Sequence, residues 1–340
     1  MEQKKYNVAV VGATGVVGEL ILDILNEREF PLAEVHALAS EKSVGKKVMF
    51  GSKPIPVDDL ASFDFTGIDF AFFSAGGDVS KEYAPKAAQA GAIVIDNTSA
   101  FRYDDDIPLI VPEVNAALLA ELPERRIIAN PNCSTIQMVV VLNPIAELVG
   151  VERVNVATYQ AVSGAGRSAI EELAQQTATM LNGQEPSVEV MPHKIAFNLI
   201  PQIDQFEENG YTREEMKMVW ETQKILADPS IKVNPTAVRV PVFYGHSEAL
   251  HIETKEPVDL EQLLSLLSST PGICLMQNDY PTPVTHAANQ DAVYVGRVRK
   301  DPSHPRGLNL WVVADNVRKG AALNAIQIAE LLVNRDRVLQ

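Results

Sequence analysis

The sequence predicts an α/β protein in which a doubly wound, Rossmann-type amino-terminal domain precedes an α+β domain. The chain has 340 residues, which is longer than a chain that usually folds around a single hydrophobic core, so two domains are expected. In the first part, short continuous apolar runs alternate with helical patterns, which is typical of a parallel sheet covered on both faces. After about Gly150 the apolar runs become longer, which indicates an antiparallel or mixed sheet.

The amino-terminal domain is expected to begin with an apolar, β-branched strand over residues 6–12 (YNVAVVG) and an amphipathic helix over residues 15–28. A second helix is expected over residues 78–90, with Asp78 as its capping residue. Further apolar runs are expected to supply strands of the same sheet at residues 35–40, 70–77, 92–99 and 107–114.

The second domain is expected to contain longer strands at residues 153–162, 236–245, 248–255, 291–300 and 308–316. A closing helix over residues 316–332 has apolar residues at helical spacing, so we expect it to pack on the first domain. The predicted domains are therefore residues 1–131, completed by the carboxy-terminal segment 316–340, and residues 132–315.

The composition excludes several classes of protein. A formal net charge of -15 argues against a nucleic-acid partner, because such proteins usually carry a basic face. Two cysteines are too few for a disulfide scaffold, and without a CxxC pair no metal site is expected. No apolar run is long enough to cross a bilayer, and residues 1–6 lack signal-peptide features. We therefore expect a cytoplasmic protein without a membrane partner.

A glycine-rich turn, GATGVVG at residues 12–18, joins the first strand to the first helix. Missing side chains in such a turn allow the backbone amides at a helix N-terminus to approach a pyrophosphate. The spacing is GxxGxxG rather than GxGxxG, so a tight turn without a ligand is the alternative. Its position after the first strand favours a dinucleotide site.

The end of the second strand decides which dinucleotide is expected. An acidic residue there usually binds the ribose hydroxyls of NAD, but this strand ends at Ser40 and continues with Glu41, Lys42 and Ser43. Lys42 and the serines suit the 2′-phosphate of NADP, whereas a Glu41 carboxylate would repel that phosphate unless it points to solvent. NADP is therefore the expected cofactor.

Cys133 is the strongest candidate for a nucleophile. It follows the polar sequence Asn-Pro-Asn and precedes the apolar run 136–149, so it should stand at a helix N-terminus, where the helix dipole stabilises a thiolate. A buried structural cysteine is the alternative. Cys274 lies in the apolar sequence ICLM and is expected in the core.

A thiolate requires an acid or base within reach, and His246, in the sequence GHSE at the start of a strand, is the best placed histidine. A structural histidine is the alternative reading. Arg102, Lys217 and Arg239 are candidates for binding an anion, because cationic side chains hold carboxylates and phosphates. Lys217 also suits an intrahelical ion pair with Glu214, three residues earlier.

Six motifs follow one another along the chain: GATGVVG at 12–18, DNTSAFR at 96–102, VPEVN at 111–115, NPNCST at 130–135, SGAG at 163–166 and GHSE at 245–248. In this order and spacing they resemble the aspartate-semialdehyde dehydrogenase family along essentially the whole chain. One departure is Lys42-Ser43, where many relatives have Arg-Ser. A lysine lacks the guanidinium fork, which weakens selectivity for NADP over NAD.

The resemblance implies a role for each candidate residue. Cys133 would carry an acyl thioester, His246 would act as acid or base, and Gln160 with Arg239 would orient the substrate. Glu214 would lie near the substrate amino group, while Arg102, Lys217 and Asn132 would bind phosphate. The implied cofactor contacts are Gly12, Thr14, Gly15, Val16, Val17, Ser40, Lys42, Ser43, Ser163, Gly164 and Asn316.

The implied reaction is the reversible, NADP-dependent reductive dephosphorylation of L-aspartyl 4-phosphate to L-aspartate 4-semialdehyde. This phosphorylating aldehyde dehydrogenase chemistry serves the synthesis of lysine, through diaminopimelate, and of threonine and methionine. The resemblance also implies a homodimer that uses inorganic phosphate. The alternatives are a related reductase for N-acetylglutamyl phosphate or a glyceraldehyde phosphate, and a relative that binds partners without catalysis.

Overall fold

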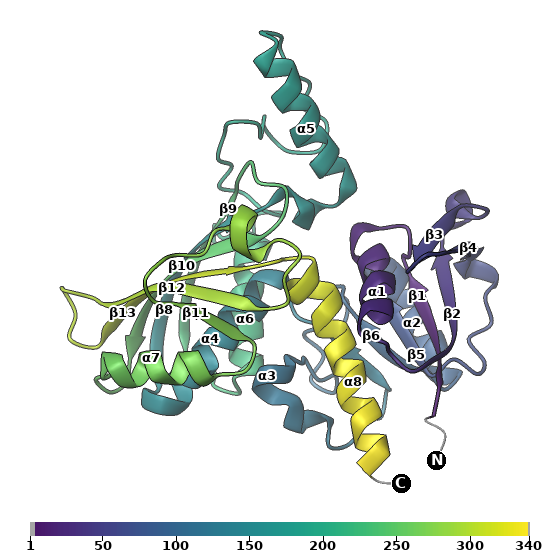
Figure 1. The fold of residues 1–340 in the computed structure, drawn as a ribbon, viewed down its shortest axis with the longest axis horizontal. Coiled ribbons are helices and arrows are strands. Elements are labelled where there is room, and N and C mark those ends of the chain that lie inside the picture. The colour runs from purple at the N-terminus through teal and green to yellow at the C-terminus, as the bar shows by residue number, and fades with distance from the viewer. Residues whose placement is uncertain (1–3, 339–340) are drawn as a thin grey trace. The chain divides into compact units, whose positions relative to one another are not determined.

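The computed structural model describes residues 4–338 and divides the chain into two compact units (Figure 1). The first unit contains residues 1–132 and 321–340, and the second contains residues 133–320. The outermost residues of the expected domains, 1–3 and 339–340, lie outside the described part of the chain. Within the described part, no helix is both long and apolar enough to span a membrane.

The first unit is built on a seven-stranded sheet in the order β3-β4-β2-β1-β5-β6-β7. All neighbouring strands are parallel except the edge pair β3–β4, which is antiparallel. The strands are β1 (Tyr6–Val11), β2 (Leu32–Ala39), β3 (Lys47–Phe50), β4 (Lys53–Asp59), β5 (Phe70–Phe73), β6 (Ile93–Asp96) and β7 (Ile127–Ala129). The helices are α1 (Val16–Glu27), α2 (Gly77–Gln89), α3 (Pro112–Asn115) and α8 (Leu323–Val338).

Strands and helices of the first unit share one apolar core, as expected for a doubly wound sheet. Tyr6, Phe30 and Phe70 pack their rings together, with centroids 5.4 to 6.2 Å apart. Leu323 and Ile326 of α8 are fully buried in the same core. The last helix of the chain therefore completes the first unit, although residues 133–320 lie between this helix and the rest of the unit in the sequence.

Three local predictions for this unit were wrong. Residues 107–114 form no strand, because Pro108 and Pro112 cannot donate ladder hydrogen bonds; only Leu109 bridges to β7, and Pro112 opens α3 instead. Asp78 lies inside the first turn of α2, whose N-cap position is Gly76. The closing helix begins at Leu323, after a π-helical turn over Arg318–Ala322.

The second unit has a mixed six-stranded sheet in the order β11-β12-β13-β10-β8-β9, in which β8–β9 and β11–β12 are parallel pairs and the others antiparallel. The strands are β8 (Val151–Gln160), β9 (Lys232–Arg239), β10 (His246–Thr254), β11 (Ile273–Met276), β12 (Val293–Lys300) and β13 (Gly307–Ala314). The helices are α4 (Cys133–Val149), α5 (Arg167–Leu181), α6 (Arg213–Ile225) and α7 (Leu260–Ser269). The predicted fold class is thus confirmed.

Helices α4, α6 and α7 pack against the sheet of the second unit, while α5 projects away from it (Figure 1). The α5 segment has its own small core, and Glu172 holds the following loop by accepting backbone N–H groups from Glu189 and Met191 at 2.6 and 2.9 Å. Cys274 is exposed on the edge strand β11, so its predicted core position was wrong.

Candidate active site and cofactor pocket

Cys133 is the first residue of the 17-residue helix α4 and is half-buried. The free amides and the dipole at a helix N-terminus stabilise a thiolate. Gly320 lies directly against this cysteine: a Cβ built at Gly320 would stand 2.8 Å from the Cys133 Cβ. Only a glycine fits there, which sequence reasoning missed because the two residues are far apart in the chain.

Three of the predicted site residues lie together at one end of neighbouring strands in the second sheet. Gln160 ends β8, Arg239 ends β9, and these two residues are register partners in a parallel pair. His246 begins β10, which runs antiparallel to β8, so the start of β10 lies beside the end of β8. Strand direction therefore gathers residues that are separated by many positions in the sequence.

His246 is completely buried and its tautomer follows from one hydrogen bond. The backbone N–H of Ala161 donates to its Nδ1 at 3.1 Å, so the proton of the neutral ring belongs on Nε2. Nε2 has no partner among the described residues, and a Cβ at Gly164 would stand 3.3 Å from it. Burial and then the Arg239 charge lower the pKa of His246 to about 3. The ring thus presents a neutral N–H donor beside Gly164.

Arg239 is buried, and its Nη1 donates to the carbonyl of Ala161 at 2.7 Å. Burial lowers the pKa of Arg239, whereas the charges of Glu214 and Cys133 raise it. Nη1 also borders Gly164, because a Cβ at this glycine would lie 3.1 Å away. Gly164 therefore keeps a space open between the guanidinium and the imidazole.

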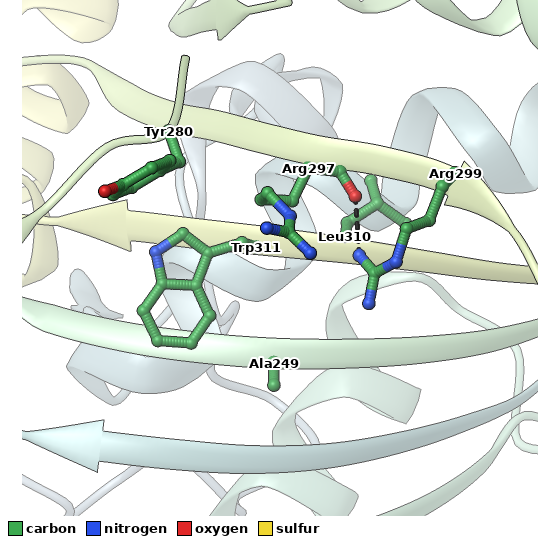
Figure 2. Close-up of a pocket in the computed structure, with 6 residues that line it drawn as sticks. All are labelled: Ala249, Tyr280, Arg297, Arg299, Leu310 and Trp311. Carbon is green, nitrogen blue, oxygen red and sulfur yellow. Dashed lines mark hydrogen bonds between the residues drawn. The ribbon is translucent and has the colours of Figure 1, made fainter.

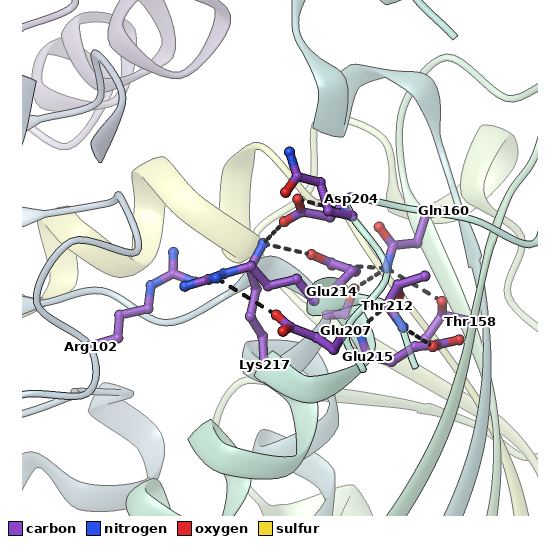
Figure 3. A network of polar contacts seen from close by, with 12 residues as sticks. Arg102, Thr158, Gln160, Asp204, Glu207, Thr212, Glu214, Glu215 and Lys217 are labelled. Atoms are coloured by element: carbon purple, nitrogen blue, oxygen red, sulfur yellow. Dashed lines mark hydrogen bonds and ion pairs between the residues drawn. The ribbon is translucent and has the colours of Figure 1, made fainter. Parts of the chain in front are cut away.

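Gln160 connects the end of β8 to helices α4 and α6 (Figure 3). Its Nε2 donates to Ser134 Oγ at 2.8 Å and to Glu214 Oε1 at 3.1 Å, so it is fixed by α4 and α6. On α6, Lys217 donates to Glu214 at 3.2 Å and to Asp204 at 2.8 Å. The predicted Glu214–Lys217 ion pair is present, and Asp204 is an additional partner of the lysine.

A capping box at the start of α6 holds Glu214 and Lys217 in place. Thr212 Oγ1 accepts from the Glu215 amide at 3.3 Å, and Glu215 accepts from the Thr212 amide at 2.7 Å. Glu215 also accepts from the Ala237 amide of β9 at 2.8 Å, which ties the helix to the strand that carries Arg239.

Two of the predicted cofactor contacts in the second unit bond to each other. Asn316 Nδ2 donates to Ser163 Oγ at 3.0 Å, and the Gly245 amide donates to Asn316 Oδ1 at 2.9 Å. Gly245 has a φ of +90°, which favours glycine, and it immediately precedes His246. Asn316 therefore stabilises the turn that presents the imidazole.

Arg102 and Asn132 belong to the first unit and are both buried. Arg102 Nη2 donates to the carbonyl of Asn97 at 2.8 Å. The Asn97 side chain accepts in turn from Asn130 Nδ2 at 2.9 Å. Asp96 fixes the same loop by accepting from Ser80 Oγ at 2.8 Å, and burial raises the pKa of Asp96. The DNTSAFR motif is thus a rigid support for Arg102.

The first unit contains a pocket of about 530 Å³ where the carboxyl ends of β1, β2 and β5 meet. Gly12 has a φ of +87°, and a Cβ there would stand 2.9 Å from Ser74, so the turn needs glycine. Gly18 packs even more closely, since its Cβ would lie 2.1 Å from the Gly12 carbonyl oxygen. This cradle at the start of α1 fits a pyrophosphate approached by backbone amides.

The pocket includes some of the predicted cofactor residues and adds others. Gly12, Thr14, Gly15 and Ser40 line it, whereas Val16, Val17, Lys42 and Ser43 are not among its lining residues. Its other lining residues are Ala39, Glu41, Asp59, Leu60, Ala61, Ser74, Ala75, Val79 and Tyr83. The small-residue turn SAGG after the β5 run was the available signal for Ser74 and Ala75.

Residues 7–122 match the family model described as semialdehyde dehydrogenase, NAD binding domain, and residues 142–319 match semialdehyde dehydrogenase, dimerisation domain. An aspartate-semialdehyde dehydrogenase 2 from Vibrio cholerae is 61% identical over 97% of this chain and 98% of its own. The aspartate-semialdehyde dehydrogenase of Bacillus subtilis is 49% identical over 96% and 97%.

Solved structures give the same result for the fold. The structure of aspartate semialdehyde dehydrogenase II from Vibrio cholerae complexed with ASA matches with a TM-score of 0.96 and 60% identity, covering 98% of this chain and 99% of that one. The Candida albicans aspartate semialdehyde dehydrogenase with NADP matches with a TM-score of 0.77 and 25% identity, covering 98% and 99%. The expected class of cofactor, a nicotinamide dinucleotide, is confirmed.

Proposed function

Because the chain belongs to the semialdehyde dehydrogenase family, we propose that it is an aspartate-semialdehyde dehydrogenase. It interconverts L-aspartyl 4-phosphate and L-aspartate 4-semialdehyde with NADP and inorganic phosphate. The observation that carries the proposal is the grouping of Gln160, Arg239 and His246 at adjacent strand ends in the unit that begins with Cys133. The reaction serves lysine, threonine and methionine synthesis in the cytoplasm, following the resemblance in the motifs.

The proposed chemistry begins at Cys133. Its thiolate forms a bond to the acyl carbon of aspartyl phosphate, and the carbon–oxygen bond to the leaving phosphate breaks, which produces a thioester and inorganic phosphate. Arg102, Lys217 and Asn132 are assigned to the phosphate, since cationic and amide donors stabilise its charge. Bound NADPH supplies the hydride that reduces the thioester, and the thiolate then leaves as the semialdehyde forms.

His246 and Arg239 have separate tasks in this scheme. The N–H of His246 Nε2 donates to the oxygen that becomes negative during attack, which lowers the energy of the transition state. Arg239 pairs with the α-carboxylate of the substrate, and Glu214 accepts from its amino group. Burial and then the Arg239 charge lower the pKa of His246, and a substrate carboxylate on Arg239 offsets only the second of these causes, so the buried ring remains a neutral Nε2 donor.

The test is phosphate-dependent reduction of NADP by the purified protein. Aspartate semialdehyde is compared with glyceraldehyde 3-phosphate and N-acetylglutamate semialdehyde, with and without phosphate. Activity confined to aspartate semialdehyde and dependent on phosphate supports the proposal. Activity on another of these aldehydes assigns the chain to a related reductase, and inactivity on all three rejects the enzyme.

A Glu41→Gln variant is expected to prefer NADP more strongly than the wild type does. Glu41 lines the pocket beside Ser40, where its carboxylate repels a 2′-phosphate, and Lys42 is exposed. We expect the ratio of kcat/KM for NADP to that for NAD to rise about 2- to 5-fold, since exposed charge pairs contribute up to about 1 kcal/mol. Glu121→Gln, which changes an exposed carboxylate outside the pocket, is the control. An unchanged ratio in Glu41→Gln would show that its carboxylate does not face the phosphate.

The proposed homodimer uses the face of the second sheet that points away from α4. Gln160 bonds to Ser134 of α4, so its neighbour Tyr159 points to the opposite face, where its ring lies 5.6 Å from that of Trp311. This face has a pocket of about 290 Å³ lined by Ala249, Tyr280, Arg297, Arg299, Leu310 and Trp311 (Figure 2). Exposed aromatic and arginine side chains around an apolar centre are typical of protein interfaces, and the matching family model is named for dimerisation.

An Ala249→Arg variant is expected to be monomeric. Ala249 is a small, half-buried residue in the middle of this face, and a long charged side chain there would fill the pocket and separate the two surfaces. Sedimentation velocity should show the wild type as a dimer and the variant as a monomer. Ser265→Arg, on an exposed position of α7, should remain dimeric. A dimeric Ala249→Arg would place the interface elsewhere.

A further inference from the structure

Beneath His246 lies a buried carboxyl group that the proposed chemistry does not use. Glu248 follows His246 by two positions in β10, so both side chains point to the face covered by α4, and both are fully buried. The register partners of Glu248 are Thr158 of β8 and Val312 of β13. Gln137 of α4 is also buried, and its Nε2 donates to the backbone carbonyl of His246 at 3.5 Å.

Two neighbouring side chains in this layer, Glu248 and Gln137, carry oxygens that accept no hydrogen bond from the described part of the chain. Neither carboxyl oxygen of Glu248 has a partner among the described residues, and neither has the amide oxygen of Gln137. An ionised Glu248 would add only acceptors next to another acceptor, at full desolvation cost. Turning the Gln137 amide round would set its oxygen against the carbonyl of His246. The Gln137 side chain lies within hydrogen-bonding reach of the Glu248 carboxyl. A proton on Glu248 removes the conflict, because its O–H can then donate to the unpartnered Gln137 Oε1.

The charged surroundings favour the same proton. Burial raises the pKa of Glu248 well above its ordinary value; the Gln137 amide lowers it, and the Glu214 carboxyl raises it. Other polar groups on this side of the sheet include Ser134 on α4 and Gln160 on β8, which bond to each other, and Arg239 at the end of β9, which bonds to the Ala161 carbonyl. Thr158 Oγ1 also lies here and accepts from Gln160 Nε2 at 3.4 Å. None of these four groups is a hydrogen-bond partner of the Glu248 carboxyl.

We propose that Glu248 is a positioning residue, a neutral carboxylic acid that donates to Gln137 and thereby fixes the backbone of His246. The inference rests on the proposed function only for the role of His246. An isolated negative charge in this layer would disfavour the Cys133 thiolate, whereas a neutral acid adds hydrogen bonding without charge. The chain from Glu248 through Gln137 to His246 joins β10 to the helix whose first residue is the nucleophile.

Two substitutions separate hydrogen bonding from charge. Glu248→Gln keeps a donor for Gln137 Oε1, and we expect it to retain at least about a third of kcat with an unchanged pH profile of kcat/KM. Glu248→Leu leaves the Gln137 oxygen without a donor, and we expect kcat to fall about 10- to 100-fold while KM for aspartate semialdehyde changes less than about 3-fold. A kcat near the wild-type value in Glu248→Leu would overturn the proposal, and so would a shifted pH profile in Glu248→Gln.

Infrared difference spectroscopy tests the proton itself without any assay of activity. Subtracting the spectrum of Glu248→Gln from that of the wild type at pH 7 should leave the carbonyl stretch of a protonated carboxyl group. A carboxylate band in its place would overturn the proposal, even if Glu248→Leu does not fold. If the wild type is inactive on every aldehyde while the protonated band is present, the proposed function fails and the buried acid stands.

Discussion

Cys133→Ser is expected to reduce kcat for phosphate-dependent NADP reduction by at least about 10³-fold, because a serine hydroxyl remains protonated where a thiol ionises. The affinity for NADP should change less than about twofold, since the pocket at Gly12 belongs to the other unit. Initial rates with aspartate semialdehyde and a fluorescence titration with NADPH measure the two quantities.

Cys274→Ser is the matched control for this experiment. Cys274 is exposed on the edge strand β11, and the proposed chemistry does not involve it, so the variant should keep the wild-type rate. Wild-type turnover in Cys133→Ser would remove the thioester from the mechanism.

The second large effect is expected from Arg239→Lys, which should lower kcat/KM for aspartate semialdehyde about 10²-fold. A lysine keeps the charge but loses the fork that holds a carboxylate with two parallel hydrogen bonds. It also loses the bond from Nη1 to the Ala161 carbonyl, and Ala161 is the residue whose amide fixes the tautomer of His246. Steady-state kinetics over a range of semialdehyde concentrations measure the change.

Arg213→Lys provides the comparison, because Arg213 makes an exposed ion pair with Glu207 on the same unit. Its kinetic constants should match those of the wild type. If Arg239→Lys also matched the wild type, a different cation would have to hold the carboxylate.

Local motifs allowed the positions of several candidate site residues on helices, strands and turns to be predicted from the sequence. Cys133 begins a helix as its polar approach indicated, and GATGVVG forms the turn between β1 and α1. Both signals are local, because a helix N-terminus and a glycine turn are specified by a few consecutive residues. The same is true of His246, at the start of a strand after a glycine with positive φ.

Long-range pairing could not be predicted in this way. Asp59 enters the cofactor pocket because β4 pairs with β2, and Gly320 lies against Cys133 only after the chain has crossed the whole second unit. Cys274 shows a different limit: an apolar run predicts a strand but does not distinguish a central strand from an exposed edge. The proton on Glu248 depends on its neighbours from three elements, which no local pattern contains.

The contact between Cys133 and Gly320 has a consequence for how the chain could be rearranged. These residues are the first and last of the second unit, so this unit has the topology of an insertion with adjacent ends, placed in the sequence between β7 and α8. An insertion with adjacent ends can be gained, lost or exchanged without stretching the host sheet. Since its first residue is the proposed nucleophile, recombination at this junction would transfer the Cys133 sulfur together with Gln160, Arg239 and His246, and leave the nucleotide-binding unit unchanged.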